Sequence, residues 1–294
     1  MSARQVVAGI GRALIAVGAL LLLFVSYQLW GTGLAESNHQ SSLRHQFDQQ
    51  LAHAGHPSTT QPPLCPNVPT VAGAAAAAPA EGQPVGELVI PKIGLDKVIV
   101  EGTSTADLRS GPGHYTGTPL PGQAGNAAIA GHRTTYGAPF YNLDQLAAPD
   151  PICVRTEQGW FIYRVSRTVI VNPSDNSVLQ AAPTNELTLT TCNPRFSSAQ
   201  RLVVQATLDA ATPAPSAPHR PAPPASADGL AGEQGAALPA ILWGAALVAV
   251  GVAVWLFGRR RRHKWAYYGA GLVPVLAVLF FFFGAVSPLL PASF

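Results

Sequence analysis

Hydrophobic and polar residues divide the chain into long apolar runs near both ends and short alternating segments between them. Residues 6–30, 238–257 and 265–294 form apolar runs that carry one charge or none. A helix needs about 20 apolar residues to cross a membrane. The pattern therefore predicts a retained N-terminal signal anchor over residues 1–30 and two further transmembrane helices over 238–257 and 265–294.

Between these runs, residues 84–210 alternate in the manner of half-buried strands. Gly, Pro and Asn separate the short segments, which is typical of an all-β barrel or sandwich. The expected strands are Val85–Ile90, Lys97–Val100, Ala127–Ala130, Pro151–Arg155, Trp160–Val171, Leu187–Cys192 and Arg201–Leu208. Short helical turns are expected at Thr105–Leu108, Tyr141–Leu146 and Ser174–Leu179.

The segments that flank this β-rich region are expected to connect it to the membrane. Residues 31–83 are predicted as an extracytoplasmic tether, because Pro, Ala, Gly, Ser and Thr dominate its second half and such a composition cannot build a core. Within it, apolar residues recur every four positions from Leu43 to Leu51, so a juxtamembrane helix is predicted over residues 36–53. Residues 211–237 are rich in Pro, Ala and Ser and are predicted as a stiff linker.

The charge distribution predicts the topology. All fifteen acidic residues lie between Glu36 and Glu233, whereas seven of the 18 basic residues lie outside that window, five of them in the loop 258–264. Because basic loops stay on the cytoplasmic side, the N-terminus and this loop are expected inside the cell and residues 31–237 outside. The chain is then a multi-pass protein of the cell membrane. Its exported part carries a net charge of −4, which argues against nucleic acid as a partner.

Three reactive side chains stand at strand ends. Cys192 closes one expected strand, and Pro194 follows because proline cannot continue a β-ladder. His132 follows a second strand, and Arg201 opens the last one. A thiol nucleophile, a proton-transfer partner and a guanidinium that holds an oxyanion are the parts of an acyl-transfer site. These positions suggest Cys192, His132 and Arg201 as catalytic residues, with a nearby cation lowering the pKa of the thiol.

Several of these assignments have alternatives. His114 is the other histidine of the β-rich region and is expected in a loop near the rim of the groove. Arg195 lies just after Cys192 and competes with Arg201; Arg133 and Arg195 are otherwise expected as surface or secondary contacts. If Cys192 is free, the other two cysteines, Cys65 and Cys153, form either a disulfide or two unpaired thiols.

The motifs around these residues resemble those of sortases. The run Thr188–Cys192 is followed by Arg201 and preceded, 60 residues before the cysteine, by His132 between Gly and Arg. The segments Gly111–Tyr115 and Gly131–Phe140 are most similar to actinobacterial class E sortases, and the resemblance covers residues 84–210. It implies a mainly β fold, namely a closed sortase-type barrel of about seven to eight strands with short helices. The membrane helices are then expected to supply location and not chemistry.

Sortases are cysteine transpeptidases that attach surface proteins to bacterial cell walls. The resemblance implies that Cys192 cleaves an LAXTG- or LPXTG-like sorting signal of secreted proteins between Thr and Gly, and that an amine of a cell-wall precursor resolves the thioacyl intermediate. It also implies that Arg201, at the start of the last strand, is the essential arginine, and that Tyr115 contacts the substrate. Thr191 is a second candidate for a substrate contact, because it lies beside the nucleophile. No cofactor or metal is expected, because Cys and His are too scattered for a zinc site and no Asp-rich calcium loop is present.

Three rival functions are weaker. The Ser–x–Gly–Cys–x–Arg signature of L,D-transpeptidases is missing, since Thr190 and Thr191 precede Cys192. Pilus-polymerising sortases usually carry an Asp–Pro–aromatic lid before the barrel, and residues 31–84 contain none. A non-catalytic docking module with a sortase fold would not need the intact trio of Cys, His and Arg.

Overall fold

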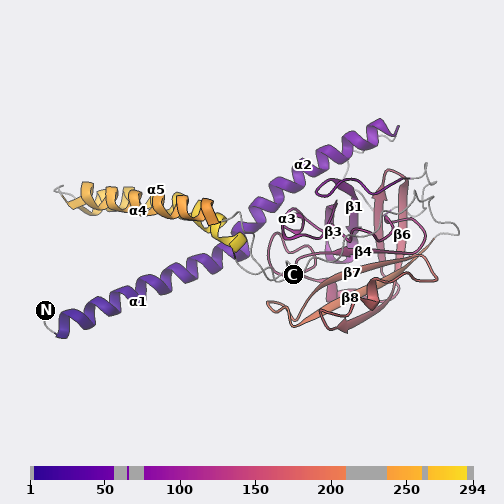
Figure 1. Ribbon diagram of the computed structural model, residues 1–294, viewed down its shortest axis with the longest axis horizontal. Helices are drawn as coiled ribbons and strands as arrows, with labels where there is room; N and C mark the ends of the chain where they lie inside the picture. The colour runs from indigo at the N-terminus through magenta and orange to yellow at the C-terminus, as the bar shows by residue number, and fades with distance from the viewer. Residues whose placement is uncertain (1–2, 56–64, 66–75, 210–236, 260–263, 290–294) are drawn as a thin grey trace. The chain divides into compact units, whose positions relative to one another are not determined.

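The computed structural model of the chain describes residues 3–55, 65, 76–209, 237–259 and 264–289 (Figure 1). They belong to two units: a helical unit built from both apolar ends of the chain, and a β-rich unit that begins at Gly33. The linker predicted over 211–237 and the centre of the basic loop 258–264 lie outside the described residues.

The β-rich unit is a barrel. Its strands are β1 (Pro84–Ile90), β2 (Leu95–Glu101), β3 (Gly113–His114), β4 (Asn126–Ala130), β5 (Pro151–Thr156), β6 (Gly159–Val171), β7 (Glu186–Asn193) and β8 (Gln200–Leu208). Among the described residues, these eight strands close in the order β1-β2-β3-β4-β7-β8-β6-β5, which confirms the predicted closed barrel. Seven of them lie where the alternation predicts a strand, each within two residues at either end. The sequence misses β3, because two residues are too few to show alternation.

Short helices connect the strands. They are η2 (Pro91–Ile93), α3 (Thr105–Leu108), η3 (Leu143–Gln145) and η4 (Asn176–Leu179), so all three predicted helical turns are present. A capping box starts α3, since the Ser104 side chain accepts from the Asp107 N–H and the Asp107 carboxylate accepts from the Ser104 N–H. This cap fixes the segment that follows α3 and leads into β3.

The interior of the barrel is apolar and tightly packed. Leu88, Ile99, Ile129 and Leu187 come from four different strands, belong to one cluster and are fully buried. Burying each such side chain contributes roughly 1.5–3 kcal/mol relative to leaving it exposed. Tyr163 lies in the same cluster, and its hydroxyl accepts a hydrogen bond of 2.6 Å from the Gly122 N–H, which satisfies its polar end.

A longer helix, α2 (Thr32–His53), packs against the barrel (Figure 1). The predicted juxtamembrane helix is thus present and begins four residues earlier than predicted. The apolar contact consists of Leu43, Phe47 and Leu51 from α2 and Val98 and Val100 from β2, all of them buried. The four-residue spacing predicts the helix, but it does not reveal that the helix docks on the barrel.

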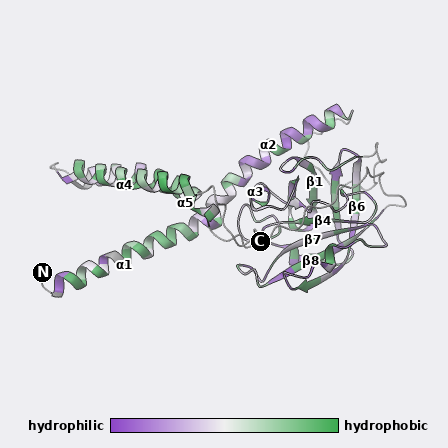
Figure 2. Ribbon diagram, viewed as in Figure 1, coloured by the Kyte–Doolittle hydropathy of each residue, from purple (hydrophilic) through white to green (hydrophobic). Residues whose placement is uncertain are grey.

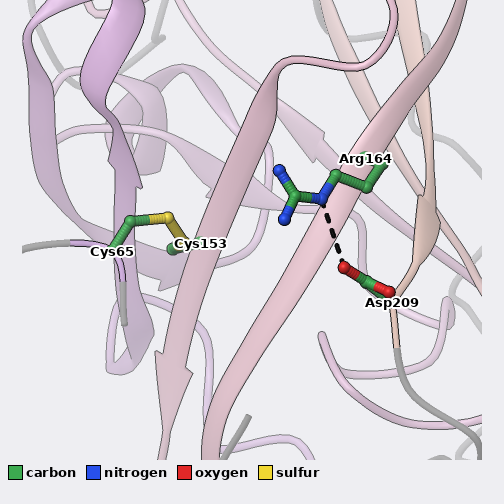
Figure 3. Close-up of a disulfide and its surroundings, with 4 residues drawn as sticks. All are labelled: Cys65, Cys153, Arg164 and Asp209. Atoms are coloured by element: carbon green, nitrogen blue, oxygen red, sulfur yellow. Dashed lines mark hydrogen bonds and ion pairs between the residues drawn. A yellow bond between two sulfur atoms is a disulfide. The ribbon is translucent and has the colours of Figure 1, made fainter. Parts of the chain in front are cut away.

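A disulfide joins Cys65 to Cys153 on β5 (Figure 3). This is one of the two alternatives that the sequence leaves open. Cys153 is fully buried beside Val89 and Ile162, because Cys65 and Trp160 cover this face of β5. The bridge therefore ties the segment between α2 and β1 to the outside of the barrel.

The helical unit contains α1 (Ala3–Ser26), η1 (Tyr27–Gly31), α4 (Ala237–Arg259), α5 (Lys264–Val286) and η7 (Ser287–Leu289). Within the described ranges, three helical stretches are long and apolar enough to cross a membrane: one begins at Arg4, and the others are Ala237–Arg259 and Tyr267–Val286. Figure 2 shows that hydrophobic residues cover most of α4 and α5, whereas α2 is largely hydrophilic. The three predicted apolar helices are therefore present, which agrees with a membrane-associated protein.

Aromatic side chains hold this unit together. Phe24 of α1 meets Phe283 of α5 edge to face, with ring centroids 5.1 Å apart. Trp243 of α4 stacks on Phe281 of α5, with centroids 4.9 Å apart. Such pairs contribute about 0.5–1.5 kcal/mol beyond their buried area. The C-terminal hairpin therefore packs against the N-terminal helix as well as on itself.

Candidate active site

The ends of three neighbouring strands bring Cys192, His132 and Arg201 into one row. Strands β4 and β7 run parallel with Ala130 opposite Thr190, so His132 and Cys192 each follow that pair by two positions. Strands β7 and β8 run antiparallel and place Arg201 directly opposite Cys192. Because neighbouring strands lie about 4.8 Å apart, the three predicted catalytic residues occupy adjacent positions in the barrel wall.

Hydrogen bonds extend the contact between β4 and β7 towards His132. The Gly131 N–H donates to the Thr190 carbonyl at 3.1 Å, and the Thr191 hydroxyl donates to the Gly131 carbonyl at 2.7 Å. Thr191 is buried and its hydroxyl is engaged in this link, while its substrate contact stays a prediction. A Cβ on Gly131 would lie 2.6 Å from the Phe140 ring, so only glycine allows this close approach.

The row lies on the outer side of the barrel wall. Leu189 of β7 belongs to the core, and side chains alternate along a strand, so Thr190 and Cys192 belong to the opposite face. The Tyr115 hydroxyl lies 3.0 Å from the Thr190 hydroxyl on that face. Tyr115 is therefore placed beside the row, and its contact with substrate stays a prediction.

Cys192 is a free thiol with only 5 % of its surface exposed. The guanidinium of Arg201 lies 3.7 Å from Sγ, and Arg133 donates to the Cys192 carbonyl at 3.0 Å. Burial raises the pKa of the thiol, and the two guanidinium groups oppose this only in part. The predicted lowering of the pKa is therefore wrong for the free protein, because desolvation outweighs the neighbouring charges.

His132 is buried under an aromatic side chain. Its ring centroid lies 5.0 Å from that of Tyr136, and the guanidinium of Arg109 lies 5.8 Å from the same tyrosine ring. Burial, and then the charge of Arg109, lower the pKa of His132 to about 4. The imidazole is therefore neutral at neutral pH, which is the form that accepts a proton.

The rival residues are engaged elsewhere. His114 is fully buried in β3, with Nδ1 2.7 Å from the Glu101 carboxylate and Nε2 2.9 Å from the Pro119 carbonyl. The loop position predicted for His114 is therefore wrong, and both ring nitrogens are occupied. Arg195 binds the carboxylate of Asp144 at 3.1 and 3.3 Å, which directs it away from the thiol.

The row offers no ligand set for a metal ion. In the part of the chain that the structure describes, no three side chains of His, Cys, Asp or Glu are grouped so that they could hold one. Cys192 has the guanidinium of Arg201 beside it, and such a charge repels a cation. The charge of this guanidinium therefore does not favour a cation at the thiol.

Comparison with known proteins decides the family. The Sortase domain model matches residues 88–209. The chain is 32 % identical over 212 residues to Sortase SrtE1 of Streptomyces coelicolor, an alignment that covers 66 % of this chain and 55 % of that protein. It is 30 % identical over 222 residues to Sortase SrtE2 of the same organism, covering 69 % of this chain and 81 % of that protein. The chain belongs to the sortase family.

These relatives confirm the predicted resemblance to class E sortases. A solved structure, sortase E from Streptomyces avermitilis, is 37 % identical with a TM-score of 0.42, covering 45 % of this chain and 91 % of that one. The chain spans just over half the length of SrtE1. The sortases related to it are cysteine transpeptidases.

Arg133 is a further residue of the candidate site that the sequence does not identify. It is buried, not on the surface, and its Nη1 donates to the Cys192 carbonyl at 3.0 Å and to Asn193 Oδ1 at 2.8 Å. Its Nη2 lies 3.3 Å from the Asp144 carboxylate. Arg133 therefore joins the segment after β4, which carries His132, to the end of β7, which carries Cys192.

We expect acid to destabilise this sortase through His132. Its pKa changes from an ordinary value of 6.5 to about 4 on folding, so between pH 6.5 and pH 4 the unfolded chain binds a proton that the folded chain does not. The stability linked to this group is complete above pH 6.5 and falls by roughly 3 kcal/mol as the pH drops to 4. Urea unfolding in detergent at both pH values measures the loss. In His132→Gln this part of the loss disappears; the same loss in both proteins would contradict the prediction.

Proposed function

We propose that this sortase is a membrane-anchored cysteine transpeptidase that cleaves a sorting signal and joins the new carboxyl end to an amine of the cell wall. One observation carries the proposal, namely the strand register that sets His132 and Arg201 on either side of Cys192. A nucleophile flanked by a base and by an oxyanion donor is the arrangement that acyl transfer needs.

The neutral resting forms of the pair define the first step. Sγ of Cys192 attacks the scissile carbonyl while its proton passes to the imidazole of His132, and the C–S bond forms. The guanidinium of Arg201 stabilises the oxyanion of the tetrahedral intermediate. The imidazolium then gives its proton to the leaving amine, the C–N bond breaks, and a thioacyl-enzyme remains.

An acceptor amine completes the reaction. It attacks the thioester carbonyl, loses a proton to His132 and forms a new C–N bond. The C–S bond then breaks, and the proton on His132 returns to the sulfur of Cys192. One amide has been exchanged for another, and the enzyme is restored without an oxidant or reductant.

We propose an LAXTG- or LPXTG-like signal as substrate, cleaved between Thr and Gly. The partners are then secreted proteins that carry this signal near their C-terminus, and a cell-wall precursor that supplies the amine. Support comes from the class E relatives and from the position of Tyr115 beside Thr190. We expect a modest preference for LAXTG, because one pocket contact discriminates by roughly 1–3 kcal/mol.

The proposed location is the cell membrane, with the N-terminus in the cytoplasm and the barrel outside. Two observations support it. The acidic residues are confined between Glu36 and Glu233, while basic residues flank the apolar helices. The disulfide between Cys65 and Cys153 is typical of an oxidising compartment.

Reporter fusions test this topology. We expect reporters placed after Gly235, within residues 259–264 and after Phe294 to lie outside, inside and outside the cell. The reason is that translocating the basic loop is disfavoured while the acidic segment is free to cross. A cytoplasmic reporter after Phe294 would contradict the second crossing of the hairpin and would leave α5 on one side of the membrane.

The experiment for the proposed activity uses the full-length protein in detergent with a quenched LAXTG peptide. We expect cleavage between Thr and Gly, a thioacyl adduct on Cys192 by mass spectrometry, and diversion to a new amide when a glycine-rich amine is added. A peptide with the same residues in scrambled order is the matched control. A folded protein that forms no adduct with LAXTG or LPXTG peptides would overturn the proposal.

A further inference from the structure

The face of α2 that packs on the barrel carries buried polar residues as well as apolar ones. Glu36 and Gln40 are only 1 % and 7 % exposed and lie on the same stripe as Leu43 and Phe47. An unpaired buried polar group costs about 1–3 kcal/mol, and more when it is charged. A helix that served only as a spacer would not bury such groups, so their partners reveal what the helix does.

Gln40 completes a free strand edge. Val98 precedes the first β2–β3 pair by two residues, so β3 does not reach its N–H and C=O. The Gln40 amide supplies both hydrogen bonds that a neighbouring strand would make. Its Oε1 accepts from the Val98 N–H at 2.8 Å, and its Nε2 donates to the Val98 carbonyl at 2.9 Å. Nε2 also donates to the Ser110 carbonyl at 2.8 Å. Helix α2 thus holds the segment after α3, in which Arg109 precedes Ser110.

Glu36 supports a second segment. Its carboxylate accepts from Lys97 Nζ at 2.7 and 2.8 Å, and a Cβ on Gly137 would lie 2.5 Å from Glu36 Oε2. Gly137 stands between Tyr136 and Ala138, and the φ angles of these three residues are +49°, +71° and +44°. Left-handed backbone at residues other than glycine costs about 1–3 kcal/mol each and persists only where its surroundings hold it. Glu36 packs against the middle of this strained turn.

The two segments meet at His132. The Tyr136 ring lies against the imidazole, with centroids 5.0 Å apart, and the guanidinium of Arg109 lies 5.8 Å from the same tyrosine. Ser110 and Gly137, which α2 contacts, are each one residue away from Arg109 and Tyr136. The enclosure of the imidazole is therefore built on positions that the helix fixes.

We propose that α2 is a positioning element of the active site, in which Glu36 and Gln40 hold the segments of Tyr136 and Arg109 against His132. The inference rests on the proposed function for its kinetic readout and deepens it, because it gives the helix next to the membrane anchor a role in turnover. A protein that begins at residue 81 would lack this support.

The test uses single variants of the full-length chain in detergent. We expect Glu36→Ala and Gln40→Ala to lower kcat about 10- to 100-fold, because a misplacement of about 1 Å at a catalytic group can cost that much. KM for the LAXTG peptide should change by less than about threefold, since the proposal has the helix act through His132 and not through contact with substrate. The pH dependence of Cys192 alkylation by iodoacetamide should also shift, because the segments that enclose His132 are then no longer held in one position.

Arg44→Ala is the matched control. Arg44 lies on the same helix, is 38 % exposed, and binds Glu87 and Asp96 of the barrel, away from the two segments. We expect it to lower Tm as much as the other two variants, while kcat stays within about twofold and the alkylation profile is unchanged. Glu36→Gln keeps the shape of the side chain and a bond to Lys97, so it should retain most of the activity that Glu36→Ala loses.

Each outcome decides the question. If all the variants lose activity only in proportion to their loss of Tm, with one common alkylation profile, the proposal is overturned. If Glu36→Ala does not fold, the comparison of Gln40→Ala with Arg44→Ala gives the same decision. A full-length chain that cleaves no peptide overturns the proposed function, whereas the alkylation profile needs no substrate and still reports on α2.

Discussion

Replacement of Cys192 by alanine is expected to abolish peptide cleavage while the barrel stays folded. The thiol is the candidate nucleophile, and loss of a nucleophile that works as a unit with its base costs about 10⁴-fold or more. The loss of folding stability should be small, because the buried side chain lies outside the main core cluster and a change of this size costs roughly 1 kcal/mol.

Steady-state cleavage of the LAXTG peptide and thermal unfolding measure the two effects of this replacement. Thr188→Ala, on the same strand and the same face, is the matched control and should keep most of the activity. Cleavage by Cys192→Ala at more than about a hundredth of the wild-type rate would remove Cys192 from the nucleophile role.

Arg201→Lys is expected to lower kcat by about 10²- to 10³-fold, the usual effect of losing an oxyanion donor. Lysine keeps the charge, but a point charge on a flexible stem does not reproduce the planar fork of donors. Arg201 is held opposite Cys192 with Nη1 3.7 Å from Sγ, so its geometry is set by the β7–β8 register. KM should change little, because the oxyanion forms only in the transition state.

Arg195→Lys is the natural comparison, since it makes the same chemical change three residues after the nucleophile. Arg195 binds Asp144 and is partly exposed, so its replacement should alter kcat by less than about threefold. If Arg195→Lys is the damaging change and Arg201→Lys is not, the oxyanion role belongs to Arg195.

The strands of the barrel could be predicted from the sequence because a buried wall imposes a period of two on side chains. The row of Cys192, His132 and Arg201 could also be predicted, since each residue marks a strand end. The residues that contact the row could not be predicted. Arg133 contacts Cys192 because β4 and β7 are parallel neighbours. The paired residues lie about 60 positions apart in the sequence, so no local pattern predicts that these two strands pair.

Two other features depend on tertiary structure in the same way. The raised pKa of Cys192 results from burial by segments distant in sequence, which the nearby guanidinium groups do not overcome. The docking of α2 depends on a strand edge at Val98 that exists only because β3 is two residues long. A short strand is invisible in the sequence, and so is the gap that it leaves for Gln40.

The disulfide has a practical consequence for counting functional enzyme. The chain has three cysteines, and pairing of Cys65 with Cys153 leaves Cys192 as the one titratable thiol. Incorporation of a small alkylating label should therefore reach one equivalent per chain, and that stoichiometry counts competent active sites in any preparation. A reductant added to protect the nucleophile can also open the bridge, and the label count would then rise to three. One mass measurement thus reports both the fraction of active enzyme and the integrity of the disulfide.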